Sequence, residues 1–115
     1  MDQSTSSSTR ATLSLLDFCT VRDNETAGKS MQRSVELAQA GERLGFDRVW
    51  YSEHHNMPSI ASSSPAVLIA HIAAKTEKIR LGAGGVMLPN HSPYVIAEQF
   101  GTLAELYPDR IDLGP

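Results

Sequence analysis

The arrangement of apolar and polar residues along the chain switches repeatedly between two patterns, one typical of β-strands and one typical of helices. Four short runs rich in branched and aromatic residues predict β-strands, at residues 13–19, 48–52, 79–86 and 110–114. Three intervening stretches repeat their apolar positions every three or four residues and predict helices, at about 30–44, 65–75 and 93–107. Gly45 is placed to end the first helix, and the Ser64-Pro65 and Ser92-Pro93 pairs are placed to begin the other two.

The predicted strands begin 35, 31 and 31 residues apart. This regular strand–helix repeat predicts parallel strands joined by helical crossovers. Both an open doubly wound sheet and a (β/α)8 TIM barrel have this repeat. Parallel strands are normally covered on both faces, and no helix follows the fourth strand. We therefore expect an α/β fold that is a fragment or must pair with another chain; if the fold is a TIM barrel, the chain is its N-terminal part, with three βα units and a fourth strand.

Composition narrows the possible partners and location. The chain has 115 residues, 41% of them hydrophobic and 20% charged, which suits one globular domain. The net charge is -3 and there is no cluster of basic residues, which argues against nucleic acid as a binding partner. No apolar run reaches the ~20 residues that a membrane span needs. Residues 1–11 predict a flexible Ser/Thr-rich leader without the apolar segment of a secretory signal, before a domain at 12–115. We expect a cytoplasmic protein.

Acidic and imidazole side chains gather where the predicted strands end. Glu53, His54 and His55 follow the second strand, and His91 follows the third, so all lie at one edge of the sheet. They allow a metal site, a proton-handling site or a hydrogen-bonded loop. Neighbouring side chains on an extended segment point in opposite directions, so Glu53 and His55 can converge while His54 points elsewhere. Two ligands are too few for a metal site, and we expect no metal, with a metal-dependent hydrolase as an alternative.

Residues 82–85 read GAGG, yet they do not form a dinucleotide-binding motif. The third glycine of G-x-G-x-x-G is replaced by Met87, and the next predicted helix begins only at Pro93. Glycines at the end of a strand instead indicate a bulge or a close approach of a flat ligand to the backbone. A flavin ring is one such ligand.

Three long segments resemble the luciferase-like flavin-dependent monooxygenases, a family of bacterial oxidoreductases. They are GFDRVWYSEHHNMPSIASSSP, LGAGGVMLPNHSP and YPDRIDLG, and the resemblance covers residues 12–114, the N-terminal part of the family's domain. It implies a TIM barrel that binds reduced FMN at its mouth and forms a C4a-hydroperoxyflavin with O2. That species would oxygenate a small-molecule substrate, and a separate flavin reductase would supply the reduced flavin.

The resemblance also assigns roles to individual residues. His54 is expected to be catalytic, as general base and stabiliser of the flavin–oxygen adduct, and a non-prolyl cis peptide is expected between Gly84 and Gly85. The expected cofactor-binding residues are Glu53, His55, Gly84, Gly85 and Val86. The expected substrate-pocket residues are Asp17, Asn56, Asn90 and His91.

Family members continue beyond the fourth strand, and their later strands hold the flavin phosphate. The resemblance therefore implies a truncated form, and one alternative is a non-catalytic half-barrel that acts only as a subunit. Another alternative is an oxidoreductase that uses deazaflavin F420 on the same barrel.

A homo- or hetero-oligomer is expected to form through residues 65–74 and 93–107. His71, in the first of these segments, is expected to be packed or to face a partner.

Overall fold

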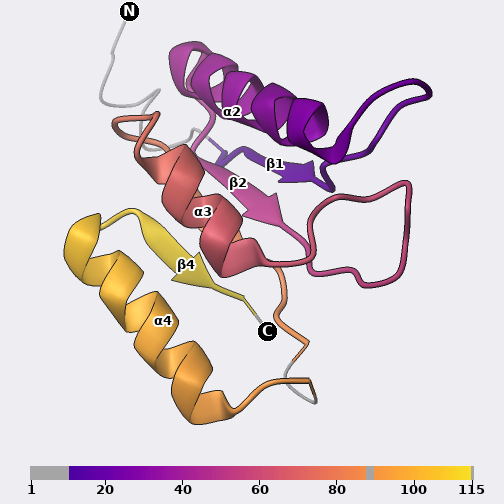
Figure 1. Ribbon diagram of the computed structural model, residues 1–115. Helices are drawn as coiled ribbons and strands as arrows, with labels where there is room; N and C mark the ends of the chain where they lie inside the picture. Colours follow the sequence, from indigo (N-terminus) through magenta and orange to yellow (C-terminus); the bar gives the residue numbers. More distant parts are fainter. Residues whose placement is uncertain (1–10, 88–89, 115) are drawn as a thin grey trace, which may run out of the picture.

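Four strands alternate with three helices in the computed structural model, which describes residues 11–87 and 90–114. In chain order they are β1 (Ser14–Asp17), α2 (Ala27–Leu44), β2 (Arg48–Tyr51), α3 (Pro65–Ala73), β3 (Arg80–Ala83), α4 (Pro93–Leu106) and β4 (Ile111–Leu113) (Figure 1). Every predicted strand and helix is present. The predicted leader, residues 1–11, lies outside the described residues except for Ala11.

The predicted boundaries shift where side chains cap the backbone. Strand β1 ends at Asp17, two residues early, because the Asp17 carboxylate accepts the N–H of Cys19 at 2.8 Å and Cys19 has a left-handed φ of 52°. Helix α2 begins three residues before the predicted Ser30, because the Thr26 hydroxyl accepts the N–H of Lys29. Strand β3 ends at Ala83 rather than at residue 86.

The strands form one parallel sheet in the order β1-β2-β3-β4. Leu15, Val49, Leu81 and Ile111 stand opposite one another in a single row across it. This is the predicted α/β architecture, with three βα units and a fourth strand of a TIM barrel. Because the strands are parallel and in sequence order, their carboxyl ends all reach the same edge.

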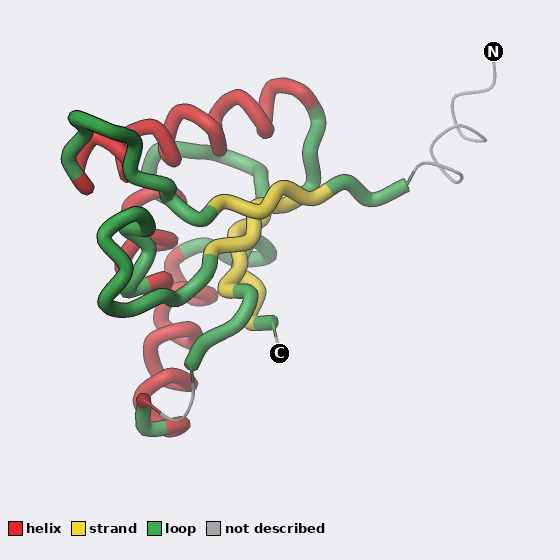
Figure 2. Tube along the Cα trace, turned by 90° about the vertical axis from the view of Figure 1, so that its right-hand side faces the viewer, coloured by secondary structure: helices red, strands yellow, loops and turns green. Residues whose placement is uncertain are grey.

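All three helices cover one face of the sheet and leave the other without a helix (Figure 2). On the covered face Val49, Tyr51, Leu81 and Ala83 are completely buried. They pack in a core with apolar residues of the helices, which include Val35, Ala38, Ile69, Ile72 and Phe100. The side chains that alternate with them point to the open face, where Leu16 is 57% exposed.

The Trp50 ring and an ion-pair network cover part of the open face. A Cβ atom on Gly82 would lie only 2.6 Å from the Trp50 ring, so the ring lies against the glycine backbone of β3. The Arg48 guanidinium lies over the same ring at 5.2 Å. Asp112 on β4 accepts from Arg48 at 2.7 Å and from Arg80 at 2.9 and 3.0 Å, which links β2, β3 and β4.

Helix α3 is apolar on both its buried and its outward sides. Ile69 and Ile72 are fully buried, whereas Val67 is 71% exposed. His71 lies on the exposed side of the helix within this chain. No described helix combines the length and apolar character needed to cross a membrane.

The Glu42 carboxylate links the end of α2, by hydrogen bonds, to the segment that leads into β3. It accepts the backbone N–H groups of Glu77, Lys78 and Ile79. Burial alone raises the pKa of the Glu42 carboxyl, but these three donors outweigh it and lower the pKa below its ordinary value. The ionised carboxylate therefore stabilises the fold.

Gly82→Ala is expected to destabilise the chain by about 1–3 kcal/mol, because the new methyl group would overlap the Trp50 ring. Urea denaturation of Gly82→Ala, Trp50→Leu and the double variant measures the effect. The double variant should lose less stability than the sum of the two single variants, since the smaller leucine side chain leaves room for the methyl group. Simple additivity would contradict the predicted overlap.

Glu42→Gln is expected to lower the free energy of unfolding at pH 7 by about 1–3 kcal/mol, the range for hydrogen bonds to a charged group. Because the folded-state pKa of Glu42 is lowered, its contribution is complete above the unfolded carboxyl value of ~4.3 and is lost as pH falls through the folded value. The free energies of unfolding of the wild-type chain and of Glu42→Gln should therefore become similar in acid. Denaturation of wild type, Glu42→Gln and the exposed control Glu36→Gln at pH 7 and pH 3 provides the comparison.

Candidate functional site

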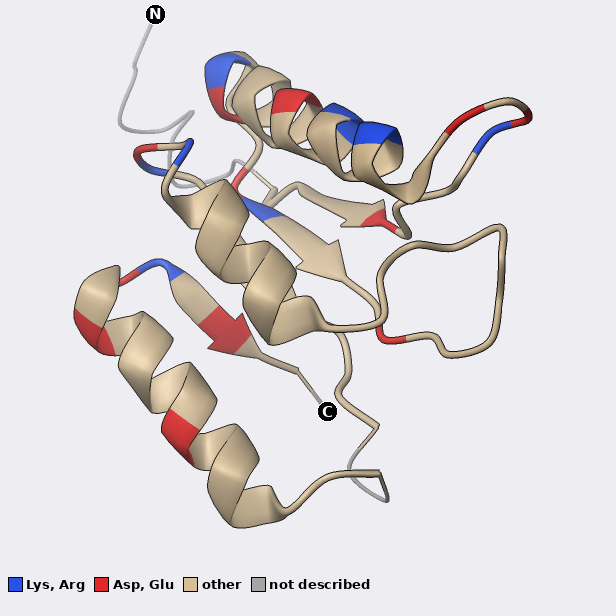
Figure 3. Ribbon diagram, in the orientation of Figure 1, with Lys and Arg blue, Asp and Glu red and all other residues tan. Residues whose placement is uncertain are grey.

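The candidate site lies at the edge where the strands end, between the loops that follow β2 and β3. The β2–α3 loop, residues 52–64, carries one charged residue of the Asp, Glu, Lys and Arg types, Glu53 (Figure 3). The β3–α4 loop brings His91 to the same place. Adjacent parallel strands thus bring together residues that are 38 positions apart.

Glu53 is the centre of this site. Its side chain is 1% exposed, and one carboxylate oxygen, Oε2, contacts Nε2 of His55 at 2.6 Å and Nε2 of His91 at 2.7 Å. The other oxygen, Oε1, accepts the N–H of Met87 at 3.1 Å. The carboxylate therefore joins the β2–α3 loop to the β3–α4 loop.

Burial of Glu53 taken alone raises the pKa of its carboxyl. The hydrogen bonds from His55, His91 and Met87 act in the opposite direction and prevail, so the pKa lies below its ordinary value. At neutral pH the group is an ionised carboxylate inside the protein, with three donors around it. Such a group holds its neighbours firmly, because leaving a buried charge without partners is costly.

His54 points away from its two neighbours, as the alternation of an extended segment predicts. Its Nδ1 atom lies 2.9 Å from the Ser52 hydroxyl, and its ring meets the Phe18 ring edge-on at 5.7 Å between centroids. The His54 backbone N–H donates to the carbonyl of Ser62 at 2.8 Å. These contacts orient the imidazole beside an open depression of about 490 Å³ lined by His54, Asn56, Met57, Pro58, Ile60 and Ser63.

The peptide bond between Gly84 and Gly85 is cis, as the resemblance implies. Gly84 is exposed and Gly85 is half-buried, and the Trp50 ring lies on one side of Gly84, 3.2 Å from the position of a Cβ atom. Val86 follows, half-buried at the edge of the core. The segment therefore presents exposed glycine backbone and a half-buried apolar side chain at the edge where the strands end.

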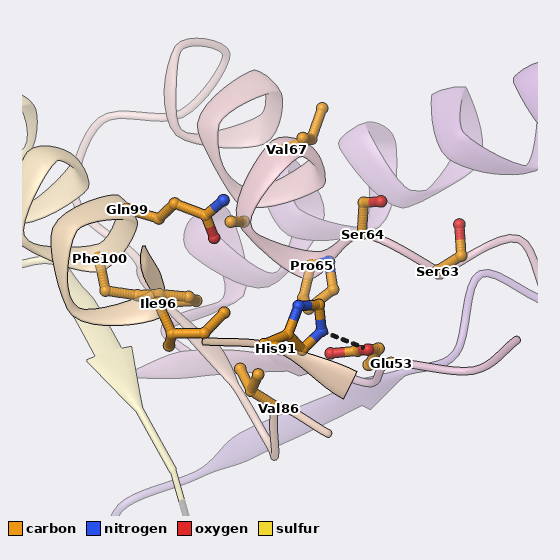
Figure 4. A pocket seen from close by; sticks show the side chains of 11 residues that line it. Glu53, Ser63, Ser64, Pro65, Val67, Val86, His91, Ile96, Gln99 and Phe100 are labelled. Atoms are coloured by element: carbon orange, nitrogen blue, oxygen red, sulfur yellow. Dashed lines mark hydrogen bonds and ion pairs between the residues drawn. The ribbon is translucent and has the colours of Figure 1, made fainter. Parts of the chain in front are cut away.

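A cavity of about 100 Å³ adjoins Glu53 and His91 (Figure 4). Pro65, Val86, Ile96 and other apolar residues line most of its remaining walls. His91 reaches between these walls to the Glu53 carboxylate. The cavity is therefore largely apolar away from the point where the acid and the imidazole meet.

The structure brings together some predicted site residues and separates others. Glu53, His55 and His91 are in contact, whereas the Asp17 carboxylate bonds the backbone of Cys19. Within the described part of the chain, the exposed side chains of Asn56 and Asn90 form no hydrogen bond with the Glu53 carboxylate. The roles expected for these residues in cofactor or substrate binding stay predictions.

Sequence reasoning missed the partners that fix the two imidazole groups. It paired Glu53 with His55 and counted two ligands, but His91 contributes a third ligand atom, a nitrogen that meets the same oxygen. The hydroxyl of Ser52, beside His54, also went unnoticed. The signal for His91 was available, because it follows the strand next to β2 and consecutive parallel strands place their loops side by side.

The sequence matches the luciferase-like monooxygenase family over residues 12–114. It is 51% identical over 102 residues to the N-acetyl-S-alkylcysteine monooxygenase of Bacillus subtilis, covering 89% of this chain and 30% of that protein. The solved structure of apo-MsnO8 superposes with a TM-score of 0.87 at 47% identity, over 90% of this chain and 31% of that one. A Baeyer–Villiger monooxygenase, the oxygenating component of 3,6-diketocamphane monooxygenase of Pseudomonas putida, solved with FMN, shares the fold at TM-score 0.84 and 23% identity, over 90% and 29% of the chains.

The chain belongs to the luciferase-like monooxygenase family. It spans about 30% of the length of the curated relatives it matches. The predicted family and barrel fold are thus confirmed.

Glu53→Ala is expected to free the N–H of Met87 and raise its hydrogen-exchange rate by roughly tenfold or more, the equivalent of one lost hydrogen bond. Amide exchange followed by NMR at neutral pH measures it. Glu105→Ala, an exposed change on α4, is the matched control and should leave Met87 protected. Equal exchange rates of the Met87 amide in the wild-type chain, Glu53→Ala and Glu105→Ala would show that Glu53 does not hold the β3–α4 loop.

Proposed function

We propose that the chain carries the proton-handling and ring-binding part of a flavin-dependent monooxygenase that uses reduced FMN and O2. The observation that carries the proposal is the placement of an oriented imidazole, His54, at the same sheet edge as the accessible Gly84–Gly85 backbone. Membership of the family supports the reaction class.

The residues at this edge suit an isoalloxazine ring. Gly84 is exposed and has no side chain of its own, and Val86 would add an apolar contact. A flat ring needs such a close approach to the backbone. Glu53 and His55 would support the ring's surroundings, and the FMN held by the Baeyer–Villiger monooxygenase is in keeping with a flavin on this fold.

Reduced FMN would supply the activation of O2 when bound. We assign to His54 the transfer of a proton, through a nitrogen atom of its own imidazole ring, to or from the reacting group beside it. Its Nδ1 atom is held by the Ser52 hydroxyl, which leaves Nε2 to face the reacting group. The Phe18 ring packs against the imidazole and limits its rotation.

The substrate that we propose is a small organic molecule, in a pocket to which Asn56, Asn90, His91 and Asp17 contribute. The 51% identical relative is named for N-acetyl-S-alkylcysteines, so small thioethers are the first class to test. A separate reductase would deliver the reduced flavin.

The outward sides of α3 and α4 are proposed to form an oligomer interface, through residues 65–74 and 93–107. Val67 is 71% exposed, Tyr94 72% and Leu106 64%, and large exposed apolar groups of this kind often mark an interface. His71 lies in the same region. A partner over these helices would bury them.

A chimera gives the sharpest test of the function. Residues 12–114 replace the matching segment of the N-acetyl-S-alkylcysteine monooxygenase, and reduced FMN, O2 and an N-acetyl-S-alkylcysteine are supplied with a reductase. The chimera is expected to oxygenate the thioether. His54→Ala in the chimera should lower kcat by about 10²–10⁴-fold, the usual contribution of acid–base catalysis.

Glu36→Ala, an exposed change on α2 outside the proposed site and interface, is the control and should keep the activity within about twofold. Titration of the chimera with FMN and with F420 shows which flavin it prefers. Equal activity of the His54→Ala chimera and its parent would overturn the role of His54. A chimera that binds F420 but not FMN would overturn the choice of cofactor.

A further inference from the structure

Three potential metal ligands meet at the junction of the two loops. Glu53, His55 and His91 each offer one ligand atom, and these three atoms all lie within 4.8 Å of one another. Both imidazoles direct their Nε2 atoms at the same oxygen, at 2.6 and 2.7 Å. Sequence reasoning set a metal site aside because it counted two ligands, and the fold supplies the third.

We propose that Glu53, His55 and His91 form a binding site for a divalent transition metal of the zinc class, which would cross-link the β2–α3 and β3–α4 loops. This site does not use His54, the residue to which we assign proton transfer, although its three ligands also lie among the residues proposed to surround the flavin and the substrate. Two imidazole nitrogens and one carboxylate oxygen are a set of three protein ligands found at open zinc sites, where a fourth position is left for water.

The ligands are prepared for a metal by the contacts around them. Oε1 of Glu53 is held by the N–H of Met87, which leaves Oε2 to bind an ion through one oxygen. Among residues 11–87 and 90–114, neither His55 nor His91 has a hydrogen-bond partner for Nδ1, so each ring proton can move there and free Nε2 as a ligand.

Little movement is needed to admit an ion. Tetrahedral zinc with bonds of ~2.0–2.1 Å keeps its ligand atoms roughly 3.3 Å apart, so the rings would move out from Oε2, now at 2.6 and 2.7 Å, by roughly 0.6–0.7 Å. The side chains of His55 and His91 are 42% and 32% exposed and have room to adjust. The adjoining cavity of about 100 Å³ is large enough for an ion and its water.

The ligand types also select among metals. Imidazole nitrogen suits Zn²⁺, Co²⁺, Ni²⁺ and Cu²⁺, whereas Mg²⁺ and Ca²⁺ prefer sites made only of oxygen atoms. With one carboxylate and two imidazoles, the site should bind Zn²⁺ much more tightly than Mg²⁺.

The test uses the 115-residue chain without an affinity tag, stripped with EDTA and titrated with Zn²⁺ by calorimetry. One Zn²⁺ per chain is expected, with Mg²⁺ weaker by at least about a hundredfold. His91→Gln and His55→Gln should each weaken Zn²⁺ binding by about tenfold or more, since each removes one ligand. Co²⁺ absorption spectra should show the strong visible bands of a low-coordinate site in the wild-type chain and lose them in His91→Gln.

Two controls make the result decisive. His71→Gln removes an exposed imidazole on α3, and His54→Gln removes the neighbouring one, and both should bind Zn²⁺ like the wild-type chain. Circular dichroism establishes that each variant is folded, and the exposed His55 provides the tolerant position if His91→Gln does not fold. Absence of 1:1 Zn²⁺ binding, or equal weakening by His71→Gln and His55→Gln, would overturn the site.

Discussion

The candidate site depends on one buried carboxylate. Glu53 is removed from water at the end of β2, and three donors from two loops compensate its charge. Because an ionised group without partners is costly in the interior, the positions of His55, His91 and Met87 are tied to that of Glu53. Neutral loop residues without such a centre would leave the two loops free to separate.

The sheet explains why this carboxylate meets its partners. Parallel strands in sequence order bring the ends of β2 and β3 side by side, and the helices on one face hold that arrangement through a fully buried core. On the open face, the ion pairs of Asp112 and the Trp50 ring against Gly82 of β3 make further links between the strands. Contacts on both faces of the sheet therefore hold the strands in place at the edge that carries the candidate site.

The two proposals for this edge differ in their use of His54. His54 points toward an open depression and is oriented by Ser52, whereas its neighbours turn to each other. The separation follows from the alternation of an extended segment, which sends adjacent imidazoles to opposite sides. The imidazole to which we assign proton transfer and two of the three proposed metal ligands therefore lie within three consecutive residues, and His54 can be changed without removing a proposed ligand.

The sequence by itself determined the strand and helix repeat, the edge where polar residues collect and the family, because periodic apolar patterns and long motifs are local signals. Element ends moved by a few residues where caps such as Thr26 decided them. Only the tertiary structure decided that His91 joins Glu53 and His55, and that Trp50 covers Gly82. Such contacts join residues far apart in the chain, and they depend on strand register and side-chain rotamers that no local pattern encodes.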